Sequence, residues 1–91
     1  MQLLQEVANV LHVDAEKLEK ESLKSFLERE LFRIEAKIYR IGSKHNIRSV
    51  LELDKKLREG KVKEENMQED FIELDYLESQ REEITKALRK I

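Results

Sequence analysis

The residues that could carry out chemistry are few, and their spacing argues against a catalytic site. His12 and His45 stand without a Cys, Asp or Glu at the spacing that would close a metal site, so we expect both to be structural or surface residues. The serines and the threonine lack a glycine-flanked elbow or a nearby histidine that would activate a hydroxyl. The two glycines are too far apart to form a phosphate-binding loop. We therefore expect no enzymatic activity and no cofactor.

Acidic residues come nearest to a metal site but do not complete one. Glu65, Glu69 and Glu73 lie one helical turn apart, as in dimetal carboxylate bundles, but those pair Glu with His and this segment has no histidine. Asp70 and Asp75 do not fit a calcium loop, because apolar residues interrupt the oxygen ligands and no turn glycine is present. The lack of cysteine excludes disulfides, thiolate zinc sites and redox motifs. We expect no bound metal.

Length and composition point to one small domain. The chain has 91 residues, of which 42% are charged, and its net charge of -2 gives no overall attraction to nucleic acid or anionic lipid. It contains no apolar run approaching the roughly 20 residues of a membrane span, and its first residues lack the features of a secretory signal. We expect a cytoplasmic protein. The enrichment in Lys and Glu resembles that of heat-adapted proteins.

The local sequence favours helix nearly throughout, because proline is absent and Leu, Glu, Lys and Arg recur everywhere. We predict an all-α fold with helices over residues 2–12, 14–41, 49–59 and 63–90. Asp14 is the expected N-cap of the first long helix. A single unbroken helix over 2–41 remains an alternative, since Asp14 alone is a weak break.

Two glycines and one capping box define the remaining helix ends. Gly42 occupies the position of a left-handed C-terminal cap, and residues 42–48 form a polar connection. Ser49 and Glu52 form a capping box in which each side chain accepts a hydrogen bond from the other's backbone amide. Gly60 is expected to end the short helix.

Each long helix carries an apolar stripe at heptad-like spacing. The stripe of the first comprises Leu27, Leu31, Ile34, Ile38 and Ile41, and that of the last comprises Met67, Phe71, Leu74, Leu77, Arg81, Ile84, Leu88 and Ile91. Arg81 is the one polar member. It either lays its methylenes on the seam while the guanidinium reaches water, or pairs with a carboxylate across an interface.

These stripes predict an antiparallel helical hairpin. The two long helices have about 28 residues each, or about 42 Å, so they can pair end to end, with the short helix folded across the open end. Further apolar residues flank the seams, and one neighbouring helix cannot cover stripes that wide. We therefore predict a homo-oligomer, preferably a dimeric helical bundle or coiled coil. Its predicted interface comprises Phe26, Phe32, Tyr39, Ile72 and Tyr76.

Charge is segregated between the long helices. Residues 24–48 hold seven basic against three acidic side chains, whereas residues 64–83 hold nine acidic side chains against Arg81. The two helices could complement each other within the chain, the excess acid could bind a basic partner, or the charges could simply be solvated. The candidate partner-binding face is Glu69, Asp70, Glu73 and Glu78. The candidate nucleic-acid face is Arg29, Arg33, Lys37 and Arg40.

Two family resemblances add expectations about function. The run from Leu3 to Leu27 resembles the helix, turn and helix of ribbon-helix-helix antitoxins, which pack as intertwined dimers. That family reads DNA with a β-strand ahead of the first helix, and only Met1 and Gln2 precede it here. The remainder resembles small helical antitoxin-like proteins of archaea and bacteria, through Ser49 to Asp54, Glu59 to Lys61 and Glu69 to Glu78. This resemblance implies a dimeric, non-enzymatic, cytoplasmic protein whose helices wrap or block a partner.

Three hypotheses follow. The first is an antitoxin-like interaction module that dimerises and binds a basic, toxin-like protein through its acidic face. The second is a DNA-binding transcriptional regulator that uses the N-terminal helices and the basic face. The third is a purely structural coiled-coil oligomer. No membrane partner is expected.

Overall fold

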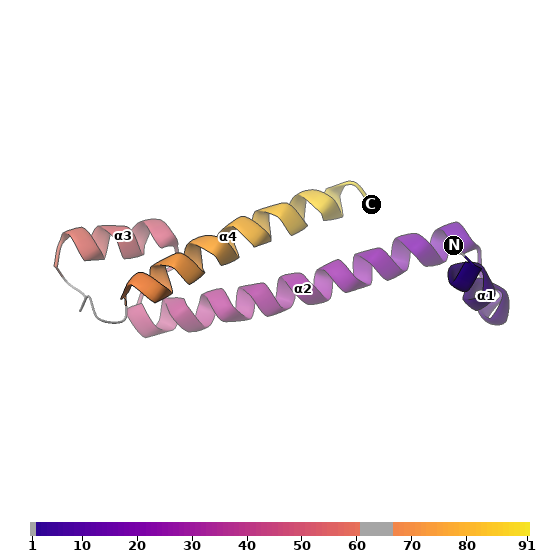
Figure 1. Cartoon of the computed structure of the whole chain (residues 1–91), viewed down its shortest axis with the longest axis horizontal. Coiled ribbons are helices and arrows are strands. Elements are labelled where there is room, and N and C mark those ends of the chain that lie inside the picture. The colour runs from indigo at the N-terminus through magenta and orange to yellow at the C-terminus, as the bar shows by residue number, and fades with distance from the viewer. Residues whose placement is uncertain (1, 61–66) are drawn as a thin grey trace.

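The computed structural model describes residues 2–60 and 67–91, and these residues form an all-α structure, as predicted. Its helices are α1 (Gln2–Leu11), α2 (Ala15–His45), α3 (Val50–Arg58) and α4 (Met67–Arg89). Figure 1 shows α2 and α4 side by side and antiparallel, with α3 at the connection between them and α1 at the far end of α2. The predicted start of the last helix, residues 63–66, lies outside the described residues. Among the described helices, none is both long and apolar enough to cross a bilayer.

The helices that were predicted to start at capping residues do so. The Asp14 side chain accepts a hydrogen bond from the Lys17 amide (3.3 Å), which starts α2. The Ser49 hydroxyl accepts one from the Glu52 amide (3.3 Å), which starts α3. The return bond of the predicted capping box differs, because Glu52 accepts from the amide of Arg48 (2.8 Å) instead of that of Ser49.

A left-handed residue separates α1 from α2, so the alternative of one helix over 2–41 is wrong. His12 has φ 56°, and its amide donates to the carbonyl of Asn9 (3.3 Å). The amide of Val13 reaches back to the carbonyl of Ala8 (3.0 Å). These two bonds form the Schellman motif that ends helices, and the Asp14 cap then starts the next helix.

The end of α2 was predicted wrongly. Gly42 lies inside α2, and the left-handed position is Asn46, with φ 53°. The Gly42 carbonyl accepts the amides of Asn46 and Ile47, the latter at 2.8 Å. A Cβ on Gly42 would lie 2.6 Å from the Ile47 carbonyl oxygen, so glycine is needed here for close approach of the chain. Gly60, with φ 67°, follows α3 as predicted.

The core lies where α2, α3 and α4 meet. Its buried members are Ile34, Ile38, Ile41, Ile47, Leu53, Leu74 and Leu77. The central part of each predicted stripe is therefore confirmed, whereas Leu27 and Leu31 are only half-buried. Ile47 is the exception to the predicted polar connection, since it is 6% exposed and packs in the core.

A contact at the connection end sets the register of the hairpin. His45 Nε2 lies 2.6 Å from Asp70 Oδ2. Stepping along two antiparallel helices from this pair brings Leu74 level with Ile41. Because α2 has 31 residues and α4 has 23, α4 ends before α2 does. In the same register Arg89, the last residue of α4, is level with Phe26. The predicted end-to-end pairing is therefore wrong, and residues 15–25 of α2, about 16 Å, extend beyond α4.

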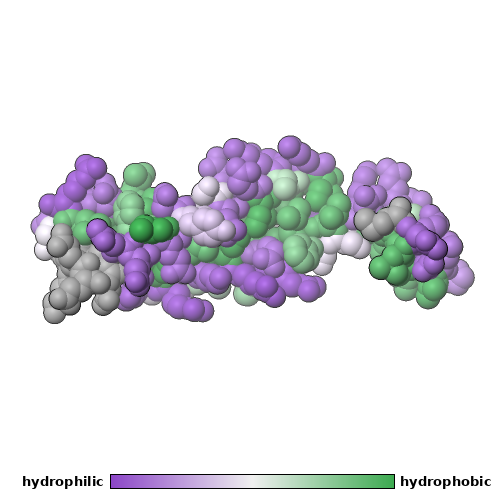
Figure 2. Space-filling view, in the orientation of Figure 1, coloured by the Kyte–Doolittle hydropathy of each residue, from purple (hydrophilic) through white to green (hydrophobic). Residues whose placement is uncertain are grey.

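The result is an elongated molecule. Its extents are 60 × 19 × 18 Å and its radius of gyration is 18.9 Å, against about 12 Å for a compact chain of this length. α3 packs against α4 at the connection end. The prediction that the short helix folds across the open end is therefore wrong. Figure 2 shows hydrophobic surface in the middle of the molecule and again at the α1 end, with a narrow neck between them.

Candidate interaction surfaces

A polar cluster holds the connection end of the hairpin together. Asp70 accepts hydrogen bonds from Lys44 Nζ (2.9 Å) and pairs with His45, and the side chains of Asp70 and His45 are 14% and 7% exposed. Burial raises the pKa of Asp70, but hydrogen bonds from His45 and Lys44 and the electrostatic interaction with these side chains outweigh it and hold that pKa below its usual 3.8. Lys56 Nζ donates to the carbonyls of His45 (2.8 Å) and Asn46 (2.9 Å). His45 thus joins α2 to α4 within this cluster.

The predicted acidic face is divided by the fold. Asp70 belongs to the polar cluster, and Glu78 is half-buried and accepts the amide of Val50 (3.3 Å). Both tie α4 to its own chain. Glu69 and Glu73 remain exposed. Of the four residues of this face, only these two are presented to solvent.

The predicted basic face is presented as one stripe. Arg29, Arg33, Lys37 and Arg40 are all exposed and follow one flank of α2 at spacings of one turn. Arg33 pairs with Glu30 on the same helix (3.2 Å). Within residues 2–60 and 67–91, Asp70 is the one carboxylate whose ion pairs join α2 to α4. Charge complementarity within the chain is therefore concentrated at the connection end.

The remaining candidates for chemistry lie apart. His12 is exposed in the turn after α1, far along α2 from His45. Over the two described ranges, no three His, Cys, Asp or Glu side chains gather into a group that could hold a metal ion.

Arg81 is half-buried in the seam, level with Ile34. It forms no ion pair with the described residues, which agrees with the interpretation that it lays its methylenes on the seam. A groove of about 460 Å³ runs beside it, with Glu35 and Glu52 also in its lining. This groove carries acids and bases side by side and so presents no dominant charge.

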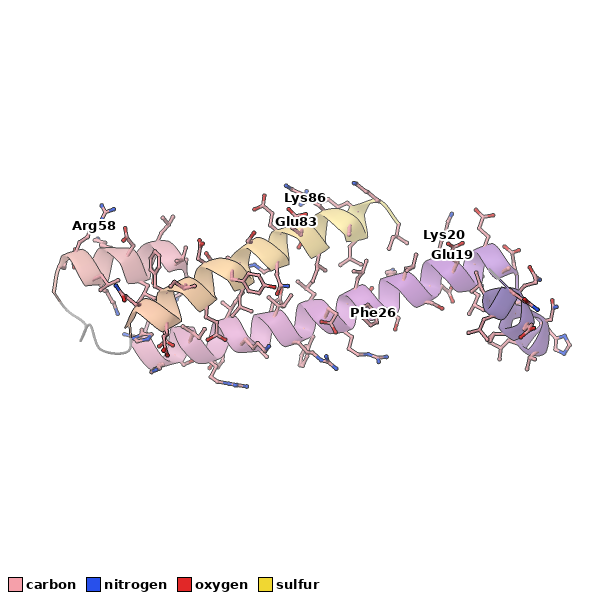
Figure 3. All side chains as sticks on the ribbon, in the orientation of Figure 1. Glu19, Lys20, Phe26, Arg58, Glu83 and Lys86 are labelled. Atoms are coloured by element: carbon pink, nitrogen blue, oxygen red, sulfur yellow. The ribbon has the colours of Figure 1, made fainter. Side chains whose placement is uncertain are left out.

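All five residues of the predicted interface are more than half exposed: Phe26, Phe32, Tyr39, Ile72 and Tyr76. They do not form one surface. Phe32 and Tyr39 are seven residues apart and lie on one flank of α2, where Tyr39 lines the groove beside Arg81, whereas Ile72 and Tyr76 occupy the outer face of α4. These two faces point away from each other, so a single partner face cannot cover both. Phe26 lies near the end of α4 (Figure 3).

Sequence reasoning missed the exposed face of α1. Leu3, Val7, Val10 and Leu11 follow helical spacing and are exposed, with Val10 at 76%. Ala8, at the edge of this stripe beside Leu4, is fully buried, because α1 packs on α2 through that edge. The sequence feature that could have revealed this face is the width of the apolar stripe of α1, because one neighbouring helix, α2, cannot cover a stripe that wide.

A groove at the open end of the hairpin was also missed. It has a volume of about 420 Å³ and is lined by Leu23, Phe26, Leu27, Glu83, Lys86, Ala87, Lys90 and Ile91. Apolar side chains from α2 and α4 dominate it, and lysines stand at its edge. Figure 3 shows Glu83 and Lys86 on α4. It shows Glu19 and Lys20 on the part of α2 that extends past the C-terminal end of α4. The groove could be found only once the unequal helix lengths were known.

Comparison with known proteins places the chain in a family. The model of the "Uncharacterized protein MJ0235 family" matches residues 1–91. A relative in Methanocaldococcus jannaschii, described as "Uncharacterized protein MJ0235", is 37% identical over 76 residues, which cover 84% of this chain and 93% of the relative. No solved structure matches the chain significantly. Neither match points to an antitoxin or a ribbon-helix-helix protein. The chain belongs to the MJ0235 family.

Proposed function

We propose that this chain is a non-enzymatic protein–protein interaction module that pairs with a second copy of itself. The observation that carries the proposal is the set of large apolar side chains exposed along the whole 60 Å length of the molecule. Apolar side chains that are exposed together, as on α1 and around the groove at the end of α4, are typical of an interface, because leaving them in water is costly. The elongated hairpin provides several such faces on one rigid helical frame.

The proposal is tested by measuring molecular mass with light scattering over a range of concentrations. The wild type should have twice the mass of one chain. Each exposed face is then altered separately, with Phe32→Lys plus Tyr39→Lys, Ile72→Lys plus Tyr76→Lys, and Phe26→Lys. Loss of the dimer in any one set, with helicity unchanged, supports the proposal. Leu51→Lys, at an exposed site on α3, is the control and should leave the mass unchanged. A wild type that is monomeric at every concentration contradicts the proposal.

An antitoxin-like role adds a basic partner protein to this dimer. Its support is the resemblance of the helical segments together with the exposed Glu69 and Glu73. Wild type and a Glu69→Lys plus Glu73→Lys variant serve as baits in the native host. A basic protein retained by the wild type and lost by the variant supports the role. Equal retention, or none, favours a purely structural oligomer.

DNA binding is the second candidate function, and the exposed stripe formed by Arg29, Arg33, Lys37 and Arg40 favours it. Phosphate contacts release counterions, so the affinity for a DNA duplex should fall steeply with salt. Fluorescence anisotropy with labelled duplex measures this. Replacing Arg33 and Lys37 with Glu should abolish binding, and an unchanged affinity would exclude the stripe as the binding surface.

A further inference from the structure

The exposed apolar face of α1 and the groove at the end of α4 both lie near the part of α2 that extends beyond α4. Residues 15–25 of α2 have no part of α4 beside them, and Figure 2 shows the molecule narrowing there. α1 already packs on α2 through the side that carries Ala8, so its face of Leu3, Val7 and Val10 is turned away from its own chain. The groove is equally open to solvent. Each chain therefore carries an unfilled apolar groove and an uncovered apolar helix.

We infer that α1 of each copy docks, through Leu3, Val7 and Val10, in the groove of a second copy. The two copies are then related by a two-fold axis, and each α1 contacts both its own α2 and the groove of its partner. This inference rests on the proposed function and specifies which face forms the dimer. An isologous contact of this kind uses the same pair of surfaces twice, once for each α1.

The dimensions of the two surfaces agree. The exposed stripe from Leu3 to Leu11 spans about 12 Å, and the lining of the groove from Glu83 to Ile91 spans about the same length. The groove has a volume of about 420 Å³. Its apolar lining consists of Leu23, Phe26 and Leu27 from α2, Ala87 from α4, and Ile91, which follows α4. Aliphatic side chains on one surface thus meet an aliphatic and aromatic groove on the other.

The charges at the edges also agree. Glu6 is the one charged residue within α1, and it lies at the edge of the apolar stripe by its position on the helix. The groove is lined by Lys86, which pairs with Glu82 (3.3 Å), by Lys90 and by one acid, Glu83, so its lining has a net positive charge. An acid beside a docked apolar helix therefore meets basic side chains, which favours this orientation of α1 over its reverse.

The exposed area is what a dimer of this kind requires. The chain exposes 7516 Å², about 1,900 Å² more than the roughly 5,600 Å² expected for a compact monomer of its mass. A standard interface removes about 800 Å² from each partner. The surplus is more than twice that area, so the chain exposes enough surface for a contact with a second copy of itself.

Cross-linking between copies tests the geometry directly, because the natural chain has no cysteine. A copy with Val10→Cys is mixed under oxidation with a differently tagged copy carrying Phe26→Cys. A mixed disulfide between the tagged copies should form in good yield. The matched control pairs Val10→Cys with Leu51→Cys, an exposed site on α3, and should give none.

A charged substitution provides a second, independent measurement. Val10→Glu should halve the mass measured by light scattering with helicity unchanged, because Val10 is exposed within its own chain. Gln5→Glu, on the opposite side of α1, is the matched control and should remain dimeric. A Val10→Glu protein that stays dimeric while the Phe32→Lys plus Tyr39→Lys protein dissociates overturns the inference and leaves the proposed function standing. A monomeric wild type overturns both.

Discussion

Replacing Gly42 with Ala separates two explanations for this glycine. In a helix interior, alanine is favoured over glycine by about 1 kcal/mol, so a change in an uncrowded helix would stabilise the protein. Here the new Cβ would lie 2.6 Å from the carbonyl oxygen of Ile47, which is backbone and cannot rotate away. Moving that oxygen displaces a residue whose amide donates to the Gly42 carbonyl and whose side chain is buried.

The expected balance is a loss of stability. Forcing a group into a packed site costs about 1–3 kcal/mol, and weakening the Ile47 hydrogen bond adds about 1 kcal/mol. After subtracting the propensity gain, Gly42→Ala should lower the free energy of unfolding by about 1–3 kcal/mol. Urea unfolding followed by far-ultraviolet circular dichroism measures this, with the exposed neighbour Ser43→Ala as the control within about 0.5 kcal/mol. A Gly42→Ala protein as stable as the wild type, or more stable, would refute the reasoning.

Three further changes test the core, the polar cluster and the helix end. Leu74→Ala, at a site 1% exposed, should cost about 3 kcal/mol in urea unfolding, whereas Ile72→Ala on the outer face should cost less than about 0.5 kcal/mol in dilute protein; equal losses would place the core wrongly. Asp70→Asn should cost about 1–2 kcal/mol at neutral pH. Since the folded pKa of Asp70 is lowered, this difference should shrink as pH falls below 3.8, and a constant difference down to pH 2 would contradict the ion-pair assignment. Gly60→Ala should cost about 1 kcal/mol because φ there is 67°, and no change in the unfolding midpoint would show that the turn adjusts freely.

Local rules predicted the helix starts well and one helix end poorly. Asp14 and Ser49 cap helices because a side-chain oxygen is placed by its own neighbours, which the sequence contains. The end of α2 depends instead on where the chain must turn to bury Ile47. Gly42 matched the usual residue type for a cap, but the close approach of Ile47 determined its role, and Asn46 took the left-handed conformation.

The candidate surfaces were predicted correctly where helical spacing alone decides the position of a residue, and wrongly where the pairing of the helices decides it. Periodicity correctly indicated that Phe32 and Tyr39 lie off the seam, because helical spacing alone fixes that relation. It could not show that Ile72 and Tyr76 face the opposite side of the hairpin, since this needs the pairing of the two helices. Asp70 was assigned to an external face for the same reason, although pairing places it against His45.

The register of the hairpin explains why apolar surface is exposed at its open end. Because Asp70 is held level with His45, the 23 residues of α4 reach back along α2 only to the neighbourhood of Leu23, which lines a groove with Ile91. The described chain has no further helix to place beside residues 15–25 of α2, while α1 is occupied on one side and exposed on the other. A shift of α4 by one turn toward α1 would cover more of α2, but it would break the Asp70 contacts and separate Leu74 from Ile41. The contacts that stabilise the connection end therefore leave the open end uncovered, and the apolar surface exposed there is the surface that the proposed dimer would bury.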